Sequence, residues 1–180
     1  MMSALVMLIA LATCGVLQTH LPAFALLGQA KPPLLLSVVL YYALRRERAR
    51  MYTSAVLAGL LHDALSPMPF GFSSCAYCVV GACVARYRKV LLTESPITQS
   101  FFGGIGAGVA TLIVYILLAS HSFVEIPPTR LLLRILGTGF YGMLVTPVIC
   151  LCLWRLDNML GNIFVAKEVE DATGEIESTT

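Results

Sequence analysis

The stretch Gly59-Leu60-Leu61-His62-Asp63, followed eight positions later by Gly71, decides how the rest of this chain is interpreted. Asp63 stands in an apolar run that extends from Met51 to Leu65. A carboxylate at membrane depth costs on the order of 3 kcal/mol on insertion scales, so it needs a partner. The run ends at Ser66-Pro67-Met68-Pro69, a turn that cannot continue a helix. We therefore expect Asp63 near the end of a helix, where it ties that helix to the following turn or to a neighbour.

The composition is that of a membrane protein. Of 180 residues, 58% are hydrophobic and 12% are charged, and the mean hydropathy is +0.83. Soluble domains carry about 25% charged residues. The length suits one domain of six spans at roughly 20 residues each. We predict an all-α integral membrane protein with six transmembrane helices in one bundle. The net charge of +2 indicates no nucleic-acid partner.

Six apolar runs mark the predicted spans, over about 2–20, 24–44, 51–66, 70–86, 100–119 and 132–154. Together they form one predicted polytopic domain over residues 1–160. The second run contains Gly28 and Lys31-Pro32-Pro33, and proline favours the first turn of a helix. Whether residues 21–44 form a full span therefore stays open, and a five-span chain with 32–44 re-entrant is the alternative. The acidic segment 161–180 is predicted to be disordered.

Basic residues gather in two short loops between spans. These residues are Arg45, Arg46, Arg48 and Arg50 in the first loop and Arg86, Arg88 and Lys89 in the second. Because cytoplasmic loops carry an excess of lysine and arginine, both loops are expected in the cytoplasm. Six spans then place both termini there as well. The predicted location is the bacterial inner (cytoplasmic) membrane, with multiple crossings of the bilayer.

The motifs that would indicate chemistry have simpler interpretations in a membrane helix. Gly137-x-Gly139-x-x-Gly142 matches a dinucleotide fingerprint, but no strand precedes it. We expect Gly137 and Gly139, with the Gly104-x-x-x-Gly108 pair, to let helices pack closely. Cys75-x-x-Cys78 has no second pair that would complete a metal site.

Nothing in the sequence assembles a catalytic constellation. His62 and Asp63 are adjacent, so their side chains point about 100° apart on a helix and do not share a face. An acyl- or phosphoryl-transfer site would need more polar groups at one depth. We therefore expect no enzymatic activity, no catalytic residue, no metal and no cofactor.

The chain resembles the MreD family of rod shape-determining proteins. The resemblance rests on Gly59-Leu60-Leu61-x-Asp63 with Gly71, preceded by Pro33 and Tyr41, and on Thr146-Pro147 in the last span. The basic loop after the second span and Arg86 after the fourth also match. The resemblance implies that Gly59, Asp63, Gly71, Pro33 and Tyr41 are structural or partner anchors.

The resemblance also implies a function. The expected protein is a non-catalytic subunit of the bacterial cell-elongation complex, which helps to couple peptidoglycan synthesis to the cytoskeleton. It would act by contact with an MreC-like membrane protein. Through that protein it would reach the MreB cytoskeleton and the RodA–transpeptidase synthase. The lipid bilayer is its other expected partner.

A second function stays open because the family is similar in fold to the substrate-binding subunits of energy-coupling-factor vitamin transporters. A vitamin pocket needs several convergent polar side chains. The predicted outer ends offer few, namely Asp63, Ser66, His121 and Ser122. The scaffold role is therefore favoured. The sequence leaves open the partner interface, the stoichiometry, a bound small ligand, and the roles of the cysteines and the acidic tail.

Overall fold

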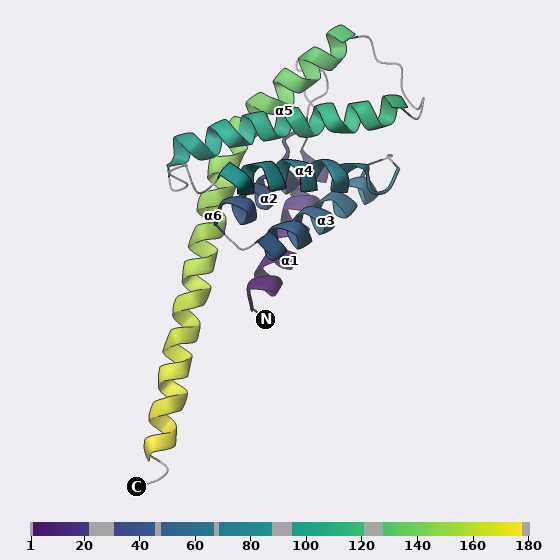
Figure 1. The fold of residues 1–180 in the computed structure, drawn as a ribbon. Coiled ribbons are helices and arrows are strands. Elements are labelled where there is room, and N and C mark those ends of the chain that lie inside the picture. The colour runs from purple at the N-terminus through teal and green to yellow at the C-terminus, as the bar shows by residue number, and fades with distance from the viewer. Residues whose placement is uncertain are drawn as a thin grey trace.

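The computed structural model describes residues 2–21, 31–45, 48–66, 69–87, 95–120 and 128–177. This part of the chain is all helical and contains no strand, which confirms the predicted helical class (Figure 1). Its six helices are α1 (Met2–His20), α2 (Leu34–Arg45), α3 (Arg48–Ala64), α4 (Phe72–Tyr87), α5 (Pro96–Ser120) and α6 (Pro128–Glu177).

The short helix α2 is the centre of the fold. Every residue from Leu34 to Leu44 is buried, and α2 packs against each of the other five helices. A helix that is apolar on all sides is stable only where protein or lipid covers it completely. The other helices supply that cover, and α2 lies among them in Figure 1.

The predicted span over 24–44 is helical only from Leu34 within the described residues. Lys31, Pro32 and Pro33 precede the helix without helical structure, and residues 22–30 lie outside the described part. Proline lacks the amide hydrogen that a helix interior needs, which explains why α2 begins after this pair. The carbonyl of Pro33 accepts the amide of Ser37 at 3.1 Å and so belongs to the first turn.

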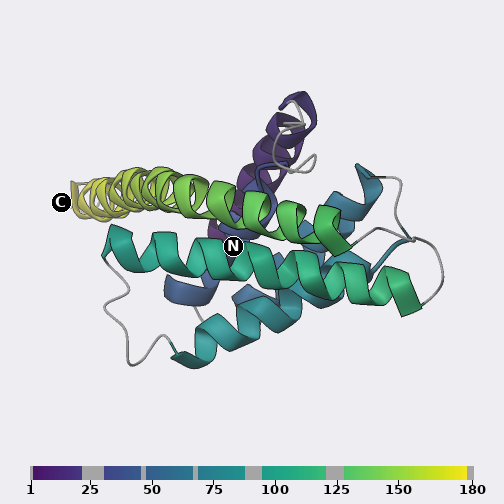
Figure 2. The same cartoon turned by 90° about the horizontal axis from the view of Figure 1, so that it is seen from above.

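Helices α5 and α6 form the most extensive helix pair, and they lie side by side in the view from above (Figure 2). Within the described residues, two helices are long and apolar enough to cross a bilayer: α5, with 25 residues, and the segment Thr129–Met159 of α6, with 31. The apolar helices Val6–His20, α2 and α4 are shorter.

Helix α6 continues beyond the bundle toward the C-terminus (Figure 1). Its helical backbone reaches Glu177, whereas the sequence predicts the end of a span at 154 and a disordered segment over 161–180. Alanine, glutamate and lysine in this segment have high helix propensity, which agrees with a continued helix. The side chains from residue 160 onward lie outside the described part, and the disorder of this segment stays a prediction.

Candidate functional site

Asp63 caps the N-terminus of the helix that follows it. It lies in the last turn of α3 and is 1% exposed. Its Oδ2 accepts the backbone amide of Gly71 at 2.7 Å, and its Oδ1 accepts the amide of Ser73 at 3.4 Å. The first amides of a helix have no acceptor within the helix, and the helix dipole favours negative charge there. The carboxylate therefore joins α3 to the start of α4.

Gly71 has a backbone conformation that this cap requires. Its φ is +100°, in the left-handed region that glycine adopts without strain. The carbonyl of Gly71 accepts the amide of Cys75 at 3.0 Å and so opens the first turn of α4. The same residue thus reverses the chain and turns its amide toward Asp63.

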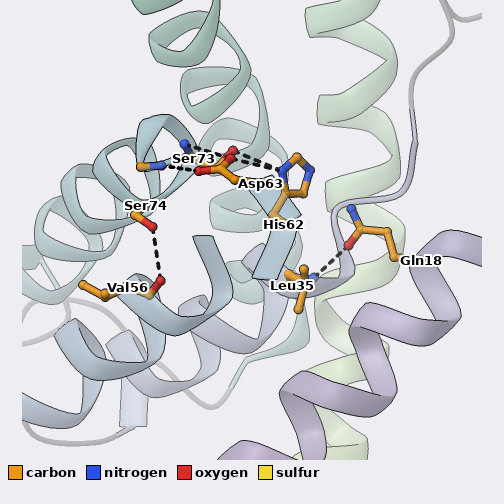
Figure 3. A network of polar contacts seen from close by, with 8 residues as sticks. Gln18, Leu35, Val56, His62, Asp63, Ser73 and Ser74 are labelled. Atoms are coloured by element: carbon orange, nitrogen blue, oxygen red, sulfur yellow. Dashed lines mark hydrogen bonds and ion pairs between the residues drawn. The ribbon is translucent and has the colours of Figure 1, made fainter. Parts of the chain in front are cut away.

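His62 completes a polar cluster at this end of the bundle, which we name the Asp63 cluster: His62, Asp63, Gly71 and Ser73 (Figure 3). The Nδ1 of His62 lies 3.0 Å from the Ser73 hydroxyl and 3.9 Å from Oδ1 of Asp63. The ring of Tyr77 packs edge-on against the imidazole at 5.9 Å between centroids. His62 and Asp63 therefore do meet, although adjacent helix positions diverge, because both side chains reach toward the N-terminus of α4.

The cluster contains Ser, His and Asp but lacks the geometry of a hydrolytic triad. In such a triad the serine and the carboxylate contact different nitrogens of the imidazole. Here Ser73 and Asp63 both face Nδ1 of His62. Ser73 is also only 1% exposed, so a substrate has no access to its hydroxyl. The arrangement orients and caps a helix.

Gly59 allows α3 and α4 to approach closely beneath this cluster. A Cβ at position 59 would fall on the backbone of Ser74. One turn away, the Ser74 hydroxyl donates to the carbonyl of Val56 at 3.1 Å (Figure 3). Small residues permit such backbone contact between membrane helices. Gly59, Asp63 and Gly71 therefore all serve the α3–α4 contact.

Tyr41 and Pro33 lie outside the Asp63 cluster and contribute to contacts made by α2. The Tyr41 hydroxyl donates to Oδ2 of Asp157 at 2.8 Å, near the end of α2. One turn further, the Arg45 guanidinium lies 5.9 Å from the centroid of the Trp154 ring, within cation–π distance. These two contacts join the end of α2 to α6.

The start of α2 is joined to α6 by a buried pair of hydroxyls. The Ser37 hydroxyl donates to the Pro33 carbonyl at 3.1 Å. The same hydroxyl lies 3.0 Å from the Thr146 hydroxyl, at hydrogen-bond distance. Both side chains are fully buried. The sequence offered little signal for this pair, because isolated Ser and Thr residues are common in apolar helices.

Glycines form the contact between α5 and α6. A Cβ on Gly104 would meet Met143, and one on Gly139 would lie 3.3 Å from the Gly104 carbonyl. A Cβ on Gly108 would lie 3.5 Å from Ile135, in ordinary contact. Gly137 is buried. The tightest backbone approach between α5 and α6 is that of Gly103 and Gly142, which were not among the predicted packing residues although both belong to the glycine motifs.

The predicted basic loops are only partly described. Arg48, Arg50 and Arg86 are exposed and Arg45 is half-buried, while Arg46, Arg88 and Lys89 lie outside the described residues. Within the described part, no three His, Cys, Asp or Glu side chains are close enough to hold a metal ion.

The fold and the cluster together define a small helical membrane protein whose polar residues join its own helices. The comparisons with known proteins specify the class further. The family described as rod shape-determining protein MreD matches residues 1–155, and the chain belongs to this family. The comparisons with curated proteins and with solved structures each give no match.

Proposed function

We propose that this chain is a non-catalytic inner-membrane subunit of the cell-elongation complex. In this role it helps to couple peptidoglycan synthesis to the cytoskeleton through an MreC-like membrane protein. MreB and the RodA–transpeptidase synthase are its indirect partners. The family match over residues 1–155 supports the rod-shape role.

The observation that carries the non-catalytic role is the engagement of Asp63. It is the one buried carboxylate among the described side chains, and both of its oxygens accept backbone amides of the α4 turn. A carboxylate used in proton transfer or substrate binding must lie within hydrogen-bond reach of the ligand, and Asp63 is 1% exposed. Asp63 instead stabilises the bundle that a partner would recognise.

The proposed architecture is a six-span bundle with both termini in the cytoplasm. The end of α2 and the start of α3 carry Arg45, Arg48 and Arg50, and α4 ends at Arg86 and Tyr87. This distribution of arginines supports a cytoplasmic location for the end of the bundle where α2 and α4 end and α3 begins. A similarity in fold to the substrate-binding subunits of energy-coupling-factor transporters is part of the same proposal.

The short length of α2 is compatible with this architecture. Its 12 residues extend about 18 Å, less than the roughly 30 Å of the hydrocarbon core. Non-helical backbone is tolerated at membrane depth where protein covers it. The burial of α2 by its five neighbours gives such cover to the start of the helix at Pro33.

Co-purification in mild detergent tests the proposal. We expect the full chain to retain a single-pass membrane protein with a periplasmic coiled coil. The control is a chain with Gly59→Leu, which separates α3 from α4 and should lose that partner. A vitamin identified by mass spectrometry in the purified protein, or a co-purifying ATPase in place of the single-pass protein, would contradict the proposal.

A further inference from the structure

Three basic side chains from three elements lie at the end of the bundle where α3 ends and α4 begins. They are Lys31 before α2, His62 at the end of α3 and Arg134 in the first turns of α6. Both Lys31 and Arg134 are close enough to act electrostatically on His62. The three residues therefore share one region next to the Asp63 cluster.

The helix register independently places Lys31 and Arg134 at one end. The Ser37–Thr146 contact at 3.0 Å and the Tyr41–Asp157 contact at 2.8 Å show that α2 and α6 run in the same direction. Both helices therefore begin at the same end of the bundle. The Oε1 of Gln18 accepts the Leu35 amide at 3.4 Å, which also brings the end of α1 there (Figure 3).

Arg134 lies on the side of α6 that faces the bundle. It is half-buried, and Gly137 and Tyr141, three and seven positions later on the same face, are buried and half-buried. Leu132, Leu133 and Leu136 cover the opposite, exposed side of the helix. The guanidinium is therefore directed by the helix toward the protein rather than toward lipid tails.

Lys31 and Arg134 lack a counter-ion within the described part of the chain, whereas His62 lies 3.9 Å from Oδ1 of Asp63. No described carboxylate forms an ion pair with Lys31 or Arg134. Asp63, the acidic residue beside them, already accepts the amides of Gly71 and Ser73. Charged residues within membrane helices usually face the protein interior and pair with an opposite charge or with backbone carbonyls.

We propose that Lys31, His62 and Arg134 form a binding site for a phosphate group, either free phosphate or the headgroup of an anionic phospholipid. The planar guanidinium of Arg134 suits two oxygens of one phosphate, and Lys31 adds a mobile positive charge. Nδ1 of His62 faces the Ser73 hydroxyl, so the other ring nitrogen, Nε2, points away from Ser73 (Figure 3). With the Ser73 hydroxyl donating to Nδ1, Nε2 carries the hydrogen and donates to the anion. The site is independent of the proposed partner.

The test uses the full chain in lipid nanodiscs with two probes. In phosphatidylcholine discs, inorganic phosphate is titrated and thermal unfolding is followed by Trp154 fluorescence. In a second arm, mixed discs with phosphatidylglycerol are used, and native mass spectrometry counts retained anionic lipid. Stabilisation by phosphate alone identifies free phosphate as the ligand. Retention of phosphatidylglycerol that phosphate does not displace identifies the lipid headgroup.

The variants decide whether the site exists. We expect Arg134→Gln and Lys31→Gln each to weaken binding of the effective probe by tenfold or more, which is about 1.4 kcal/mol. Lys31 is exposed, so its replacement leaves the fold intact. Arg155→Gln, an exposed arginine later in α6, is the matched control and should bind as the parent does. The proposal is overturned if neither probe binds, if both site variants bind normally, or if Arg155→Gln loses as much.

Discussion

The carboxylate of Asp63 accepts the backbone amide of Gly71 at 2.7 Å, so the last turn of α3 caps the first turn of α4. Asp63 and Gly71 both belong to the sequence pattern Gly59-Leu60-Leu61-x-Asp63 with Gly71. Gly59 adds the close approach of the same two helices. The pattern therefore encodes one helix–helix corner, in which each of three residue types has a separate physical task.

Replacing Asp63 by alanine should lower the free energy of unfolding by about 2 kcal/mol, since the amides of Gly71 and Ser73 lose their acceptor while buried. Asp63→Asn keeps one acceptor oxygen and should lose roughly half as much. Unfolding in mild detergent, followed by Trp154 fluorescence, measures both. If Asp63→Asn were as stable as the parent and yet lost the partner, the charge would act outside the cap.

The position of Asp63 and its contact with the following turn were predictable, whereas its other neighbours were not. The turn at Ser66–Pro69 placed the residue near a helix end and indicated a contact with the following turn. The contacts to Ser73 and of Gly59 to Ser74 depend on how α3 packs on α4, and spacing along one helix carries no such information. For the same reason, the approach of His62 to Asp63 differed from the expectation based on adjacent helix positions.

Gly59→Ala should destabilise the bundle by about 2 kcal/mol or more, because the added Cβ meets the backbone of Ser74, which cannot move without separating α3 from α4. Gly108→Ala is the matched control, since its Cβ would lie 3.5 Å from Ile135 in ordinary contact. Thermal unfolding of both variants in the same detergent gives the comparison. Equal effects at the two positions would mean that the α3–α4 contact is looser than the structure indicates.

The core shows what composition alone cannot give. The sequence predicts a bundle of apolar helices, and it identifies Gly104 and Gly139 as packing residues. It does not distinguish a helix that faces lipid from one that is covered by protein, because both are apolar. The complete burial of α2 follows from the arrangement of its five neighbours, and the contact of Gly103 with Gly142 follows from how α5 packs on α6.

Tyr41→Phe removes the hydroxyl that donates to Asp157 at 2.8 Å while it keeps the buried ring. A hydrogen bond to a charged acceptor contributes about 1.5 kcal/mol, so a loss of that order is expected. Tyr52→Phe, at a residue that is 46% exposed, is the control and should change stability little. Chemical unfolding of both variants measures the difference. A Tyr41→Phe variant as stable as the control would show that the contact between the end of α2 and α6 depends on Arg45 and Trp154.

The topology is tested by cysteine labelling in a chain whose six native cysteines are replaced. With six spans, Glu47→Cys and Ser3→Cys face the cytoplasm, so neither reacts with an impermeant reagent added to intact cells, whereas Ser66→Cys reacts. The five-span alternative, with 32–44 re-entrant, places the N-terminus outside and makes Ser3→Cys reactive while Glu47→Cys stays protected. Labelling at position 47 from outside contradicts both topologies, because an excess of arginine marks the cytoplasmic side.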